Sequence, residues 1–166
     1  MSARGDKMMT GSQGIWKKAF TLVLPGAIAF WLANFAISRT SIAAEYRAAQ
    51  SISYYPMLLE ALIGGLIIGF CISIFLLRFF DKIPAKNPIF KSLLLSFIVL
   101  IMVTVLIEAP AKLLAPTDDA LRYFLIGTIF NLIRILVLGL AIGYVCKRRY
   151  KGFNPSVFSS KIARVA

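Results

Sequence analysis

Four long apolar stretches dominate the pattern of hydrophobic and polar positions along the chain. They cover residues 19–37, 56–79, 89–107 and 121–145, and polar, basic segments separate them. At ~1.5 Å per helical residue, each stretch is about long enough to cross a bilayer core of ~30 Å. The pattern predicts an all-α integral membrane protein with four transmembrane helices in an antiparallel bundle.

The connections between the stretches predict further features. The connection 81–88 is short and carries two prolines, so the second and third helices should be antiparallel neighbours. Pro110 and Pro116 are expected to end the third helix. In the first connection, apolar residues at about helical spacing favour a short amphipathic helix on the outer membrane surface, with Ser41 as its N-cap. An irregular loop is the alternative there.

The ends of the chain differ from its middle in composition. Residues 1–14 are polar, with Gly, Ser and Thr, and are expected to form a mobile arm. Residues 15–150 hold the transmembrane domain, and residues 151–166 form a basic tail with few packing signals. Hydrophobic residues make up 59% of the chain and its mean hydropathy is +0.80. A soluble domain of 166 residues could not bury so much apolar surface.

The basic residues predict an orientation. Of the 19 lysines and arginines, 14 fall in or beside the N-terminal arm, the 81–88 connection and the C-terminal tail, and four fall on the opposite side. Positively charged loops stay in the cytoplasm, so both termini should be cytoplasmic, in a plasma or inner membrane. The first apolar stretch also resembles a secretory signal; if it were cleaved, three spans would remain with the new N-terminus outside.

Small residues recur along two of the predicted helices. Ala61, Gly65, Gly69 and Ser73 are four residues apart in the second apolar stretch, and Gly139 and Gly143 form a similar pair in the fourth. Helices in lipid associate through close packing, so small residues mark contact faces. The faces can serve packing within the chain or, alternatively, a homo-oligomer or a partner subunit.

Arg134 is the one basic residue well inside a predicted span. It lies about 13 residues into the fourth stretch, roughly 20 Å along the helix axis. An arginine at mid-membrane is unfavourable by about 2.5–3.5 kcal/mol on insertion scales. Asn131 is three residues earlier and shares its face. Since helical side chains lean toward their own N-terminus, Arg134 should reach outward, toward a carboxylate.

Two carboxylates are candidates for this partner. Glu60 is near the outer end of the second span, and Glu108 is at the outer end of the third. We expect Glu60 to be the partner, with Asn34 of the first span completing a polar cluster. Each carboxylate also has a simpler explanation: the N-terminal helix dipole for Glu60, and a surface pair with Lys112 for Glu108. The cluster can be a structural clamp, a substrate or ion site, or a contact with another protein.

Several classes of chemistry lack support in the sequence. The chain has no histidine, the usual general base and a common metal and haem ligand. Cys71 and Cys146 are far apart in sequence and form no CxxC motif. No GxSxG motif, paired intramembrane aspartates or phosphate-binding loop occurs. We expect no catalytic residues, no cofactor and no metal site.

The net charge of +12 would suggest nucleic acid in a soluble protein. Here the basic residues flank apolar spans, without a nucleic-acid-binding motif, so anionic lipid headgroups on the cytoplasmic side are the expected partners. These observations predict a non-enzymatic structural or accessory membrane protein, as a homo-oligomer or in a larger complex. The alternative is a small transporter or channel that uses Arg134 with Glu60 or Glu108.

Overall fold

The computed structural model describes residues 12–80, 82–85, 87–113 and 119–149, and these fold into helices joined by short turns. The elements are α1 (Ser12–Ser38), α2 (Ser41–Ala49), α3 (Tyr54–Arg78), α4 (Pro88–Val103), the π-helical turn η1 (Thr104–Glu108), α5 (Ala109–Leu113) and α6 (Ala120–Arg149). Most of the predicted arm and all of the predicted tail 151–166 lie outside the described residues.

Four of these helical segments are long and apolar enough to cross a membrane. They are Trp16–Ser38, Tyr54–Arg78, Pro88–Ala111 and Ala120–Arg149, of 23, 25, 24 and 30 residues. The third runs without a break through α4, η1 and α5. The prediction of an all-α membrane bundle with four transmembrane helices is confirmed, and the chain is a multi-pass membrane protein.

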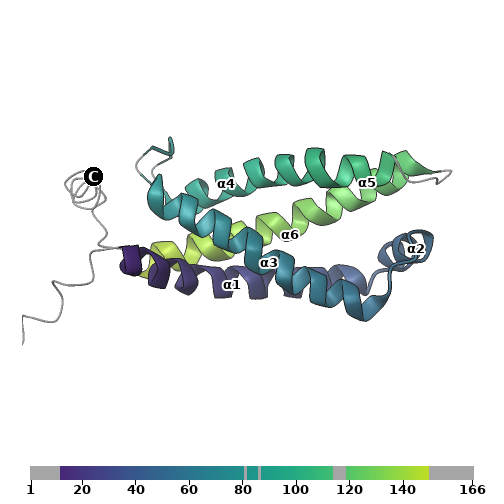
Figure 1. The fold of residues 1–166 in the computed structure, drawn as a ribbon, viewed down its shortest axis with the longest axis horizontal. Coiled ribbons are helices and arrows are strands. Elements are labelled where there is room, and N and C mark those ends of the chain that lie inside the picture. Colours follow the sequence, from purple (N-terminus) through teal and green to yellow (C-terminus); the bar gives the residue numbers. More distant parts are fainter. Residues whose placement is uncertain (1–11, 81, 86, 114–118, 150–166) are drawn as a thin grey trace, which may run out of the picture.

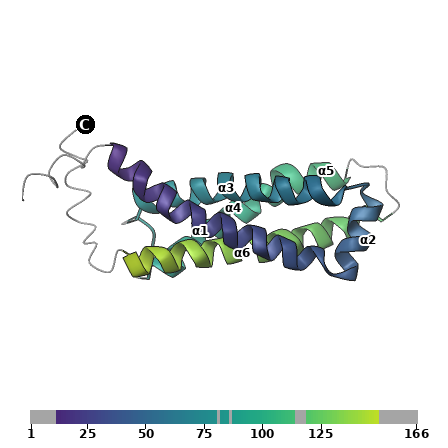
Figure 2. The ribbon, with the colours of Figure 1, turned by 90° about the horizontal axis from the view of Figure 1, so that it is seen from below.

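The four long helices do not pack in chain order. α1 packs along both α3 and α6, and α4 packs along α6, whereas α3 and α4 make few contacts with each other. Figure 1 shows α3 and α4 converging at their connecting loop and separating toward the other end. The short 81–88 connection therefore makes the two helices antiparallel but not closely packed. Below, the "α2 end" is the end with α2 and α5, and the "loop end" is the end with residues 79–88 (Figure 2).

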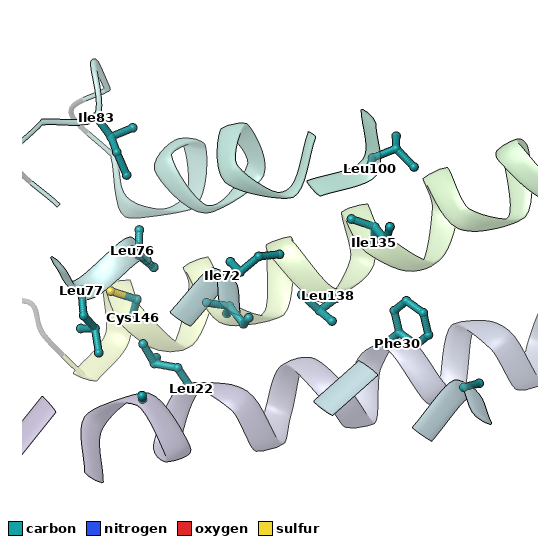
Figure 3. Close-up of a cluster of buried hydrophobic side chains, with 13 residues drawn as sticks. Leu22, Phe30, Ile72, Leu76, Leu77, Ile83, Leu100, Ile135, Leu138 and Cys146 are labelled. Atoms are coloured by element: carbon teal, nitrogen blue, oxygen red, sulfur yellow. The ribbon is translucent and has the colours of Figure 1, made fainter. Parts of the chain in front are cut away.

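The core lies along the axis where the helices meet. Leu22 of α1, Ile72 and Leu76 of α3 and Leu138 of α6 are almost fully buried and point toward one another (Figure 3). The outward faces are equally apolar. Many large hydrophobic side chains there are more than half exposed, among them Phe20, Leu24, Ile28 and Leu32 of α1. These side chains face the bilayer, which takes the place of water as their solvent.

The small-residue stripe of α3 packs inside the chain. Ala61, Gly65, Gly69 and Ser73 are all buried. A Cβ at Gly65 would lie 3.1 Å from the ring of Phe30, and one at Gly69 would lie 3.6 Å from the carbonyl oxygen of Val23, both in α1. The stripe is therefore occupied by α1 of the same chain.

The second pair of small residues lies against α4. A Cβ at Gly139 would be 2.9 Å from the Cβ of Ser96, and one at Gly143 would be 2.7 Å from the Cα of Ile89. Ser92 and Ser96 supply small residues on the α4 side, so the two backbones approach closely. Packing within one chain uses both stripes in full.

Two details at the α2 end differ from expectation. The predicted short helix is present, but its N-cap is Thr40, whose hydroxyl accepts a hydrogen bond from the amide of Ala43 at 3.2 Å. Ser41 is the first helical residue instead. Pro110 does not end the third span, which continues to Leu113. The π-helical turn η1 precedes Pro110 and shifts the hydrogen bonding there, so the missing N–H of the proline falls where the helix is already irregular.

A buried lysine links α3 and α4 at the loop end. Lys91, counted with the loop charges in the sequence, is 6% exposed in the first turn of α4. Its Nζ donates a hydrogen bond to the carbonyl of Phe80 and lies 4.0 Å from the centroid of that ring. Carbonyls past the end of a helix lack helical partners, and a cation satisfies them well. Lys91 thus fixes the start of α4 to the end of α3.

Candidate functional site

The candidate site is a cluster of polar side chains inside the bundle, toward the α2 end, which we call the polar cluster. It consists of Asn34 from α1, Glu108 from η1, and Asn131 and Arg134 from α6. Asn131 and Arg134 are three residues apart, so they share a face of α6 that looks toward α1 and the third span. Asn34 and Asn131 are buried, at 3% and 8% exposed, whereas Arg134 and Glu108 are partly buried.

Arg134 is held by its own chain. Its Nη1 donates to Oδ1 of Asn34 at 2.8 Å, and its Nε donates to the carbonyl of Phe130 at 3.1 Å. The guanidinium carbon also lies 5.8 Å from the ring centroid of Phe30. The bond to Phe130, one turn earlier, points the side chain toward the N-terminus of α6. These contacts compensate part of the energy needed to bury a cation.

Glu108 joins the cluster through Asn131. Its Oε1 accepts a hydrogen bond from Nδ2 of Asn131 at 2.7 Å, and its carboxylate is near enough to attract Arg134 electrostatically. Glu108 is the last residue of η1, and π-helical turns often occur at functional positions in helices. The cluster therefore contains one anion and one cation, each from a different span.

Glu60, the preferred partner in the sequence interpretation, lies elsewhere. Its side chain is exposed on α3. The adjacent Ala61 faces α1 and is 7% exposed. Consecutive residues on a helix point about 100° apart, so the packing of Ala61 turns Glu60 away from the interior. The structure thus brings together four of the five polar residues named from the sequence, with Glu108 in the place expected for Glu60.

Gly127 and Tyr46 belong to the site and were not singled out from the sequence. A Cβ at Gly127 would lie 2.9 Å from Oε2 of Glu108 and 3.0 Å from the hydroxyl of Tyr46. Only glycine allows both groups to approach α6 this closely. The spacing along the chain partly indicates the role of Gly127, because it precedes Asn131 by four residues and Arg134 by seven and so lies on the same helical face.

Helix α2 covers the α2 end of the cluster. Tyr46 packs edge-on against Tyr123 and Phe130 of α6, with centroid distances of 6.1 and 5.8 Å. Glu45 forms a 2.7 Å ion pair with Arg122, although both side chains are about half exposed and the pair adds little stability. Aromatic packing is therefore the main contact that holds α2 on α6.

Several atoms of the site lack a hydrogen-bond partner within the described part of the chain. They are Nδ2 of Asn34 and Oε2 of Glu108 in the polar cluster, and the hydroxyls of Thr104 and Thr128, which lie about one helical turn before Glu108 and Asn131. Buried polar atoms in proteins are rarely left unpaired, because each loses its hydration without compensation. The polar cluster thus has more hydrogen-bonding capacity than its own residues use.

The cluster contains one cation and one anion, and each is hydrogen-bonded to an asparagine rather than to the other. Among the described residues, no group of three or more His, Cys, Asp and Glu side chains is placed to hold a metal ion. No family model, curated protein or solved structure matches the chain. The geometry of the polar cluster is therefore the main guide to function.

Proposed function

We propose that the chain is a non-enzymatic membrane protein with a structural or accessory role, in which the polar cluster clamps the helices together. The observation that supports this most directly is the contact set of Arg134. Its bond to Asn34 joins α6 to α1, while its bond to Phe130 fixes the side chain on α6 itself. Asn131 joins α6 to the third span through Glu108. The guanidinium of Arg134 is therefore bound by groups of its own chain, as expected for a residue that stabilises the fold.

The surface supports a role carried out within the bilayer. Exposed apolar side chains cover all four spans, and the exposed cations Lys17, Arg78, Lys82 and Lys147 to Arg149 gather near the loop end. Anionic headgroups at a cytoplasmic membrane surface would attract these cations. We infer that the loop end faces the cytoplasm of a plasma or inner membrane. Since both small-residue stripes pack internally, a second copy or a partner subunit would bind through larger apolar side chains.

The experiment compares assembly and folding in membranes of the native host. Wild type and the Arg134→Leu/Glu108→Gln double variant, both tagged, are extracted in mild detergent and their assembly sizes compared on native gels. A structural clamp predicts that the double variant still folds and enters the same assembly, because neither charge then needs compensation. Loss of the assembly by a well-folded double variant would show that the charges themselves contact a partner or substrate, and would contradict the proposal.

A small transporter or channel is the second candidate. The observation that favours it is the set of unpaired polar atoms beside Arg134 and Glu108. Intramembrane charged residues that face an interior commonly mark a pathway for ions or substrates. In that case the double variant should fold and assemble normally but lose transport in reconstituted vesicles.

A further inference from the structure

The unpaired atoms in and beside the polar cluster can all be satisfied by hydrogen bonds. Nδ2 of Asn34 can donate a hydrogen bond, Oε2 of Glu108 can accept one, and the hydroxyls of Thr104 and Thr128 can do either. They come from three different spans. A ligand that satisfies both Asn34 and Glu108 must therefore both accept and donate hydrogen bonds.

The charges in the cluster decide between classes of small ligand. A cation at Oε2 of Glu108 would be repelled by Arg134, and an anion at Arg134 would be repelled by Glu108. At short range inside a protein such repulsion is large. A neutral molecule is repelled by neither charge. Water is neutral and can donate two hydrogen bonds and accept two. Internal waters typically make about three hydrogen bonds to buried polar groups that are otherwise unpaired.

Tyr46 marks the α2 end of the polar cluster. A Cβ built on Gly127 would lie 3.0 Å from the hydroxyl of Tyr46 and 2.9 Å from Oε2 of Glu108. The hydroxyl and the carboxylate are therefore close neighbours at this point of α6. The Tyr46 ring stands between α2 and α6, against Tyr123 and Phe130. Tyr46 thus lies over the carboxylate where the bundle meets the short helix α2.

From these contacts we propose that the polar cluster is a binding site for internal water, entered from the α2 end beneath Tyr46. Water bound there completes the hydrogen bonding of Asn34 and Glu108 and hydrates the two charged side chains inside the membrane. α2 then acts as the cover of the site, with the Tyr46 ring as the part that restricts exchange. The site is distinct from a dry clamp, in which the protein alone surrounds the charges.

Solid-state NMR in liposomes can test the proposal by measuring magnetisation transfer from water to side-chain N–H groups. The chain has four asparagines and two tryptophans, so selective ¹⁵N labelling gives few signals. The control is Trp31, one helical turn from Asn34, whose indole N–H is already bonded to the carbonyl of Leu58 at 3.2 Å. We expect severalfold stronger transfer to Nδ2 of Asn34 than to Trp31.

Two variants test the entrance. Tyr46→Ala should speed the exchange of the Asn34 amide with bulk water severalfold, whereas Tyr55→Ala should not. Tyr55 is at the same end and is 82% exposed. Within the described part of the chain, its ring packs against one other ring, that of the neighbouring Tyr54. Transfer to Asn34 no stronger than to Trp31 would overturn the water site. Equal exchange in the two tyrosine variants would overturn the entrance beneath Tyr46.

Discussion

Replacing Gly143 with alanine should destabilise the bundle, whereas the same change at Gly64 should not. A Cβ at Gly143 would lie 2.7 Å from the Cα of Ile89, 3.1 Å from the Cβ of Ser92 and 3.3 Å from the carbonyl oxygen of Pro88. Two of these three neighbours are backbone atoms, which cannot rotate away. At Gly64 a Cβ would meet nothing within 4 Å.

The magnitude follows from these distances. Carbon atoms prefer separations of about 3.5–4.0 Å, so α4 and α6 must move apart by about 1 Å to admit the new methyl group. Overpacking of this kind typically costs about 1–3 kcal/mol. Alanine is favoured over glycine in a helix by roughly 0.5–1 kcal/mol, which offsets part of this at Gly143. We expect a net loss of about 1–2 kcal/mol for Gly143→Ala and a gain of up to ~1 kcal/mol for Gly64→Ala.

The assay is unfolding in mixed micelles by increasing fractions of a denaturing detergent, followed by far-ultraviolet circular dichroism. Gly69→Ala is an intermediate control, because its Cβ would have only ordinary contacts of 3.6 and 3.8 Å with Val23 and Leu138. A difference of 1.4 kcal/mol corresponds to about a tenfold change in the unfolding equilibrium, as for any two-state equilibrium. If Gly143→Ala unfolds at the same detergent fraction as Gly64→Ala, the close approach of α4 to α6 is wrong.

Three further predictions concern the charges. Arg134→Ala should destabilise the bundle by about 1–3 kcal/mol, because it leaves the buried Oδ1 of Asn34 without its hydrogen-bond donor; detergent unfolding measures this, and a smaller loss than for Glu60→Gln would contradict it. In a double-mutant cycle, Arg134→Leu and Glu108→Gln should couple by about 0.5–3 kcal/mol while Arg134→Leu and Glu60→Gln should be additive. A cysteine at Arg47 should react with an impermeant reagent from outside intact cells and one at Arg148 only after permeabilisation; reversed reactivity would overturn the proposed orientation.

Much of the fold could be predicted from the sequence because lipid imposes simple rules. A span needs about 20 apolar residues in one helix, and four such stretches are plain in this chain. Small residues at intervals of four identify packing faces, since only they let backbones approach in lipid. The stripe beginning at Ala61 and the pair Gly139 and Gly143 are such faces in the structure. What the pattern could not give is the partner of each face.

The polar cluster shows the same limit. Asn131 and Arg134 could be paired from their spacing on one helix, which is a local property. The choice between Glu60 and Glu108 depends on which span lies opposite, and that is fixed by packing between distant segments. The distance of Glu60 or Glu108 from the end of its own span does not show which span packs against Arg134. Tyr46 was missed because its role depends on where α2 folds back onto α6.

The order of packing has a consequence for synthesis of the chain. α1 and α3 are adjacent in the order of insertion, so this pair can assemble as soon as α3 enters the bilayer. α4 packs mainly on α6, the last span to emerge. Until then Glu108 is without Asn131, and the close contact of Ser96 with Gly139 is missing. A chain that stops before residue 120 would therefore leave a carboxylate and a serine-lined face in lipid, which membrane quality control can recognise and degrade.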